Sequence, residues 1–182
     1  MRRFIFLLFL TLNIYCWSQQ FEPEFNNSGV LVSNFSASDT IATKLQRCIV
    51  SYSGPNGWSF SPKVHAVVKG NTSNCVALCS QPFAIIIRME NNDQDPASFI
   101  RLVKLEQKKN ERRLEVSSIN LWTNQIKEGN NINDQPFDAK KYGTSSYLIY
   151  PSIEDKGEYG LIIFNPNNND EKPSQILCFS IK

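Results

Sequence analysis

The 182-residue chain contains one histidine, His65, and this scarcity excludes several kinds of catalyst. A metallohydrolase site with two or three imidazole ligands cannot form around a single histidine. An excess of one charge is also missing, because 19 Lys and Arg stand against 17 Asp and Glu, which gives a net charge of +2. We therefore expect no nucleic-acid partner. The sequence also lacks a triad signature, a phosphate-binding Gly-rich loop and a repeated carboxylate motif, so we predict that the protein is not an enzyme.

A long apolar stretch occurs at the N-terminus. Arg2 and Arg3 precede residues 4–17, which are apolar except for Thr11 and Asn13, and the small residue Ser18 follows them. This order is typical of a Sec-type signal peptide, here residues 1–18, and the stretch falls short of the ~20 residues that cross a bilayer. A membrane anchor and a lipoprotein acylated at Cys16 are the alternatives. We expect a secreted or periplasmic protein with no transmembrane segment in the mature chain and, once both arginines are removed, a net charge of about 0.

The rest of the chain has the composition of one globular domain, with 41% hydrophobic and 20% charged residues. Residues 19–43 are rich in Asn, Ser and Glu, which predicts an irregular segment with a single strand at 29–34. From residue 44 to 182, short apolar runs alternate with turn clusters, the spacing of an antiparallel β-sandwich. The β-branched run at 85–87 predicts the centre of a sheet. Residues 99–106 and 112–117 predict a hairpin with a solvated, basic tip that includes Lys104, Lys108, Lys109, Arg112 and Arg113.

One short motif points to a more specific fold. The sequence Asp155-Lys156-Gly157-Glu158-Tyr159 resembles the D-x-G-x-Y corner of immunoglobulin-like β-sandwiches. In that family the tyrosine hydroxyl bonds to nearby backbone and fixes a crossing between sheets. The resemblance implies a single immunoglobulin-like sandwich in which Asp155, Gly157 and Tyr159 have structural roles. Leu161 stands where the second cysteine of a true immunoglobulin domain would fall, and the chain is also similar to uncharacterised secreted bacterial domains.

Removal of residues 1–18 leaves four cysteines, Cys48, Cys75, Cys79 and Cys178. In an oxidising compartment they permit up to two disulfides with three connectivities. Cys75 and Cys79 would lie ~13 Å apart in a strand, beyond disulfide reach, so they can pair only across a loop or turn. The loop-like residues 69–74 favour that pairing. A bond from either one to Cys48 or Cys178 remains open.

A soft-metal site is the alternative use of the same thiols. Cys75 and Cys79, with His65, have ligand types that bind Cu(I) or Zn²⁺, which would make the protein a periplasmic metal or thiol module. A structural disulfide fits an exported protein better, and His65, between Val64 and Ala66, fits a half-buried strand position. We therefore expect no cofactor.

Aromatic residues near turns suggest how the protein could act. Trp58 and Phe60 follow the turn Gly54-Pro55-Asn56-Gly57, and Trp122 lies elsewhere near polar residues. Loops of a sandwich carry its variable chemistry, and exposed aromatics stack on sugars or anchor protein interfaces. The sequence therefore predicts a binding module of the cell envelope or extracellular space, with a glycan or a protein as ligand. Residues 54–60 are the candidate surface, joined by the long loop at 128–141.

Overall fold

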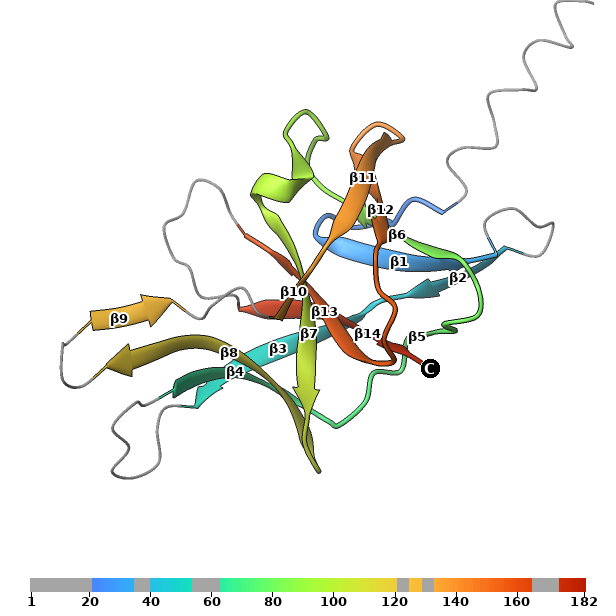
Figure 1. The fold of residues 1–182 in the computed structure, drawn as a ribbon. Coiled ribbons are helices and arrows are strands. Elements are labelled where there is room, and N and C mark those ends of the chain that lie inside the picture. The colour runs from blue at the N-terminus through green and yellow to red at the C-terminus, as the bar shows by residue number, and fades with distance from the viewer. Residues whose placement is uncertain (1–20, 35–39, 54–62, 121–124, 129–132, 165–173) are drawn as a thin grey trace, which may run out of the picture.

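The computed structural model describes residues 21–34, 40–53, 63–120, 125–128, 133–164 and 174–182, which form an all-β fold without an α-helix among them (Figure 1). Every pairing between described strands is antiparallel except one, in which β5, Val76–Ala77, runs parallel to β14, Gln175–Ile181. The predicted all-β, antiparallel class is confirmed. Among the described residues, no helix has the length and hydropathy needed to span a bilayer.

The first layer is a five-stranded sheet in the order β11-β12-β6-β1-β2. β6, Phe83–Arg88, lies in the middle, between β1, Ser28–Ser33, and β12, Ser146–Pro151. The outer strands are β2, Ile41–Lys44, and β11, Phe137–Tyr142. The predicted central position of residues 85–87 is confirmed, since all three isoleucines are fully buried.

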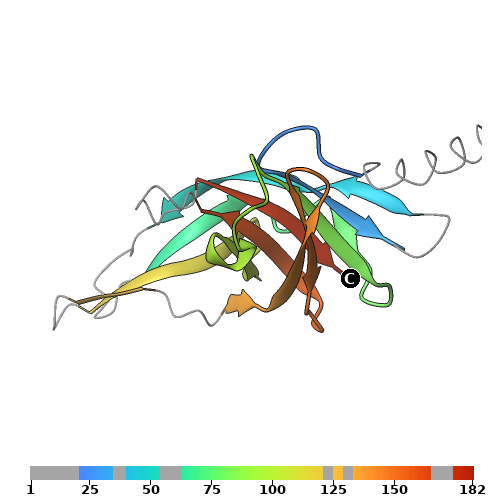
Figure 2. The ribbon, with the colours of Figure 1, turned by 90° about the horizontal axis from the view of Figure 1, so that it is seen from above.

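The second layer is a closed barrel of six strands. In order around the ring these are β3, Gln46–Ser53; β4, Lys63–Lys69; β8, Glu111–Asn120; β7, Ile100–Gln107; β13, Gly157–Ile163; and β14. β10, Asp134–Gln135, extends the wall beside β7, and β9, Gln125–Glu128, extends it beside β8. Figure 2 shows the yellow β8–β9 region reaching away from the first layer. A 3-10 turn, η1, Pro96–Ser98, precedes β7.

The two layers share one apolar core. Leu31, Ile85 and Ile149 of the sheet meet Leu161 and Phe179 of the barrel wall. Full burial of an aliphatic or aromatic side chain of this size contributes about 1.5–3 kcal/mol, so this interface carries much of the stability. The core of the interface is completed by Phe99, Ile100, Leu102, Tyr147, Tyr159 and Leu177, among others.

The barrel interior is a separate and tighter core. Its walls contribute mostly small or aliphatic side chains: Cys48, Ala66, Val68, Val103, Leu105, Leu114, Ile162, Ile176 and Cys178. Gly160 faces this interior, where a Cβ would lie only 2.4 Å from the Cγ2 atom of Ile176. A narrow ring of strands leaves no room for another methyl group at that point.

The closed barrel departs from the predicted immunoglobulin-like sandwich, whose two sheets are both open. The predicted hairpin at 99–117 is present, but β7 and β8 pair only at Glu106 with Arg113 and at Gln107 with Arg112. Beyond these pairs the strands separate, and β8 continues along β4 with a register shift between Val64 and His65. This divergence lets β8 close the ring, a long-range pairing that strand spacing alone does not reveal.

The N-terminal segment also contributes more than was predicted. Residues 19–43 were expected to be irregular with one strand, yet their described part supplies both β1 and the start of β2. β1 sits next to the sheet centre, and Leu31 and Val32 are buried on its opposite faces. The described part of this segment is therefore integral to the first layer.

The tyrosine corner is present. The Tyr159 hydroxyl donates a 2.8 Å hydrogen bond to the backbone oxygen of Asp155, and the Tyr159 side chain is fully buried. Gly157 has a φ of +154°, a conformation that favours glycine. The corner lies where the chain leaves β12 of the sheet and enters β13 of the barrel, so it fixes the crossing between the two layers.

Candidate functional site

A cavity of about 440 Å³ opens between the sheet and the barrel at one end of their shared core. Its volume lies within the range of small-molecule sites. The sheet side is formed by residues before β1, after β6 and on β12, and the barrel side by the end of β13 and the start of β14. The lining residues are Asn26, Asn27, Met89, Glu90, Asn91, Gln94, Phe99, Tyr147, Leu161, Ile163, Phe164, Ser174, Gln175 and Leu177.

The floor of this cavity is apolar and firmly packed. Phe99 and Tyr147 meet edge to face with their ring centroids 5.9 Å apart. The Tyr147 hydroxyl donates a 2.7 Å hydrogen bond to the backbone oxygen of Gln94, and burial raises the pKa of this hydroxyl. Because the floor belongs to the core between the layers, it is preformed rather than assembled by loops.

The rim is polar and exposed. Asn26, Asn91, Gln94 and Gln175 carry amide side chains, and each amide offers both hydrogen-bond donors and an acceptor. Glu90 adds one carboxylate. Among the described lining residues there is no Lys, Arg, His or Cys. The site is therefore suited to a neutral ligand with many hydroxyl groups above an apolar face.

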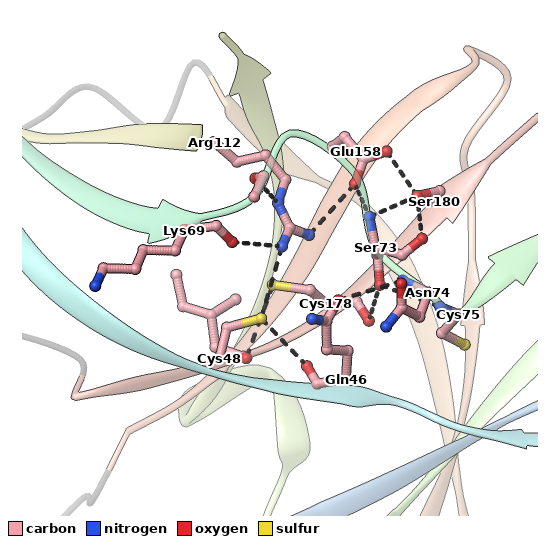
Figure 3. Close-up of polar contacts among 12 residues, drawn as sticks. Gln46, Cys48, Lys69, Ser73, Asn74, Cys75, Arg112, Glu158, Cys178 and Ser180 are labelled. Atoms are coloured by element: carbon pink, nitrogen blue, oxygen red, sulfur yellow. Dashed lines mark hydrogen bonds and ion pairs between the residues drawn. The ribbon is translucent and has the colours of Figure 1, made fainter. Parts of the chain in front are cut away.

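A second polar cluster lies inside the barrel, and its centre is a buried ion pair (Figure 3). The Arg112 Nη1 atom lies 3.3 Å from Glu158 Oε2, and both side chains are almost completely buried. Arg112 Nε also donates to the backbone oxygen of Gly70 at 3.0 Å. Glu158 accepts a 2.6 Å bond from the Ser180 hydroxyl and a 2.8 Å bond from the Ser73 backbone N–H. These bonds satisfy the two charges inside the protein, as buried charges require.

This cluster holds a loop over one end of the barrel. The Ser73 hydroxyl donates to the backbone oxygen of Cys178 at 3.0 Å, and the backbone oxygens of Lys69 and Gly70 accept from Arg112. The loop between β4 and β5 is thereby fixed to β8, β13 and β14. Its burial makes the cluster a structural device rather than a surface for a ligand.

Arg112 corrects the expectation of a solvated basic tip. It is fully buried, whereas its neighbour Arg113 is partly exposed and lies beside Glu111. The sequence does indicate this burial, because side chains alternate between the two faces of a strand. Arg112 therefore shares one face of β8 with the apolar residues Leu114 and Val116. That face turns into the barrel.

The predicted Cys75–Cys79 disulfide is absent, and all four described cysteines are free thiols. Between them, Val76 and Ala77 form the extended strand β5, which holds the two cysteines apart along the edge of β14. Cys75 lies in the core between the layers, where burial raises its pKa to about 11. Cys79 is exposed and contacts the backbone oxygen of Glu154.

The structure does not bring together the residues of the soft-metal alternative. His65 is on β4, opposite Ser53 and Glu115, while Cys75 and Cys79 flank β5 beside β14. In the part of the chain that the structure describes, no three His, Cys, Asp or Glu side chains are grouped to hold a metal ion.

The predicted aromatic surface cannot be placed. Trp58, Phe60 and Trp122 lie outside the described residues, as does the whole of the segment 54–60. No protein-family model matches the chain, and no curated protein matches it. The chemistry of the cavity must therefore carry the functional argument.

Proposed function

We propose that the protein is an exported, non-enzymatic binding protein whose ligand is a neutral saccharide held in the cavity between sheet and barrel. Export rests on the signal-peptide pattern of residues 1–18. The observation that carries the ligand class is the combination of an amide-rich rim and an apolar floor in one preformed site. Sugars present hydroxyl groups at their edges and C–H groups on their faces, and this site offers partners for both.

The composition of the lining argues against two other ligand classes. Phosphorylated or carboxylated ligands call for Arg or Lys, and the described lining has neither. A protein ligand would need a broader apolar patch with aromatic anchors, whereas here the aromatic floor is recessed below the amides. The described lining holds one carboxylate, Glu90, and the hydroxyls of Ser174 and Tyr147, with no His, Lys or Cys beside them, which supports binding without catalysis. An immunoglobulin-like ancestry of the frame is a further proposal, supported by the tyrosine corner.

The test is an array of neutral and anionic glycans probed with the full chain, followed by calorimetric titration of the best neutral glycan. Removing one amide contact should weaken binding about 2- to 12-fold, because a hydrogen bond contributes about 0.5–1.5 kcal/mol. Asn91→Ala and Gln175→Ala test the two walls. Asn110→Ala is the matched control, since its exposed amide lies at the turn that follows β7, at the opposite end of this strand from the cavity.

Three results would contradict the proposal: no binding to any neutral glycan, preference for anionic glycans, or equal loss of affinity in Asn91→Ala and Asn110→Ala. Binding that persists in both cavity variants but is lost in Trp58→Ala would transfer the site to residues 54–60. Capture of a protein partner through that same tryptophan would favour the protein-ligand alternative.

A further inference from the structure

Two of the four thiols lie together inside the barrel. Cys48 is on β3 and Cys178 on the neighbouring strand β14, which runs antiparallel to it. In the register Cys178 is opposite Gln46, and Cys48 is opposite Ile176. Residues two apart on a strand share a face, so Cys48 and Cys178 point to the same side as diagonal neighbours. Both belong to the core of the barrel.

The two side chains are in direct contact. The Cys48 and Cys178 thiols interact, since each shifts the pKa of the other, and Figure 3 shows their sulfur atoms next to each other beneath Arg112. Arg112 Nη2 also donates to Cys48 Sγ at 3.7 Å. Cys48 is 7% exposed, whereas Cys178 is completely enclosed. Cys48 is therefore the thiol that an external reagent reaches first.

We propose that Cys48 and Cys178 are an oxidisable pair that forms a disulfide between β3 and β14 when a disulfide oxidant such as oxidised glutathione is present. The dithiol described here is the reduced form. A disulfide commonly joins Cα atoms up to about 6.8 Å apart, and diagonal neighbours in a sheet lie about 7–8 Å apart, so the bond closes when the two strands shift toward each other. Cys75 and Cys79 have no such partner among the described residues, because one is in the other core and one is at the surface.

The surroundings favour Cys48 as the attacking sulfur. The hydrogen bond from Cys178 and the charge of Arg112 lower the pKa of Cys48 to about 7 against the opposing effects of burial and Glu158. The hydrogen bond to Cys48, together with burial, raises the pKa of Cys178. The reaction therefore begins with a Cys48 thiolate, since the thiolate is the nucleophile in disulfide exchange.

The thiol–disulfide exchange with the oxidant takes place in two steps. The Cys48 thiolate attacks one sulfur of the oxidant, whose S–S bond breaks and whose other half leaves as a thiolate that takes up a proton. Cys178 then transfers its proton to solvent and attacks Cys48 Sγ, and the second half of the oxidant leaves and is protonated. Two protein thiols are oxidised to one disulfide, and the oxidant is reduced to two thiols.

The test is a peptide map of the full chain. The protein is reduced, equilibrated with mixtures of reduced and oxidised glutathione, and alkylated in denaturant. The expected product links the Cys48 peptide to the Cys178 peptide and is two hydrogen atoms lighter than the separate peptides, while Cys75 and Cys79 carry the alkyl label. Alkylation of both Cys48 and Cys178 throughout, or a different linkage, would overturn the proposal.

Two variants make the result independent of folding defects. Cys75→Ser/Cys79→Ser should retain the cross-link, and its loss there would count against the pair. In wild type, oxidation should raise the urea midpoint of unfolding, because the bond closes a long loop in the unfolded chain. Cys48→Ser/Cys178→Ser should show no redox-dependent shift, and an equal shift in that variant would assign the effect to other thiols. None of these readouts depends on saccharide binding.

Discussion

The two cores of this protein differ in the size and polarity of their side chains. The core between the layers contains large aromatic and isoleucine side chains, such as Phe179, which stacks on Tyr159 with ring centroids 5.7 Å apart. The barrel interior contains small side chains, a glycine, two thiols and one buried ion pair. Two facing layers can spread apart to accept large rings, whereas a six-stranded ring fixes its own diameter. The core between the layers leaves a cavity at its edge, whereas polar groups around the Arg112–Glu158 pair close one end of the barrel interior.

The largest effect is expected from breaking the barrel's ion pair. Arg112→Met leaves Glu158 buried without its counter-charge and should reduce the free energy of unfolding by about 3–5 kcal/mol. Adding Glu158→Gln should restore part of this loss, because the uncompensated charge is removed. Chemical denaturation measures both variants. Lys63→Met, at the exposed Lys63–Glu115 pair, is the control and should cost at most about 1 kcal/mol. Equal losses of unfolding free energy in Arg112→Met and Lys63→Met would contradict the larger effect expected at the buried ion pair.

Added side-chain volume should be tolerated differently by the two cores. Gly160→Ala places a Cβ 2.4 Å from Ile176 Cγ2 inside the barrel, and overpacking of this kind should cost about 1–3 kcal/mol. Ala139→Val, at a partly buried position against the core between the layers, should cost less because that core can yield at its edge. Thermal unfolding of both variants decides the matter. An unchanged melting temperature for Gly160→Ala would contradict the tight packing of the barrel interior.

The link between the cores is tested by one hydroxyl group. Tyr159→Phe keeps the ring on Phe179 but removes the bond to the Asp155 backbone, and should destabilise by about 1 kcal/mol. Tyr150→Phe is the matched control, at a half-buried ring beside Lys140. An unchanged melting temperature for Tyr159→Phe would show that the corner does not stabilise the crossing.

A further effect is expected from pH, through the buried cysteines of both cores. The folded pKa of Cys48 is lowered to about 7 from 9.0, so the unfolded chain binds more protons between these values and stability should rise with pH across that window. The raised pKa values of Cys75 and Cys178 act in the opposite direction above pH 9, where stability should fall. Denaturation of the reduced protein from pH 6 to 10 tests both slopes. Cys48→Ser should remove the first slope and weaken the second, because Cys48 contributes to the raised pKa of Cys178 whereas that of Cys75 comes from burial. A rise that persists in Cys48→Ser would assign it elsewhere.

Local sequence patterns predicted much of this structure. The closure of the barrel could not be predicted from them, because it depends on pairing between strands that are distant in sequence. The β-branched run at 85–87 and the motif ending in Tyr159 led correctly to a sheet centre and a corner, because each depends on residues close in sequence. The barrel depends on β8 meeting strands far apart in sequence, so it could not be predicted from spacing. The charge of Arg112 predicts exposure to solvent. Its position two residues before Leu114 on the same strand indicates instead that its side chain faces the barrel interior. The cavity joins residues from 26 to 177, and no single motif marks it.

The most direct test of the proposed function is a ¹H–¹⁵N NMR titration of the full chain with the neutral glycan that binds best on the array. Shifts should concentrate on the cavity, including the side-chain amides of Asn91, Gln94 and Gln175, while backbone amides of the barrel interior such as those of Val68 and Leu114 remain unmoved. Shifts confined to residues 54–60, shifts centred on the barrel interior, or no shifts at saturating glycan would contradict the assignment of the cavity as the binding site.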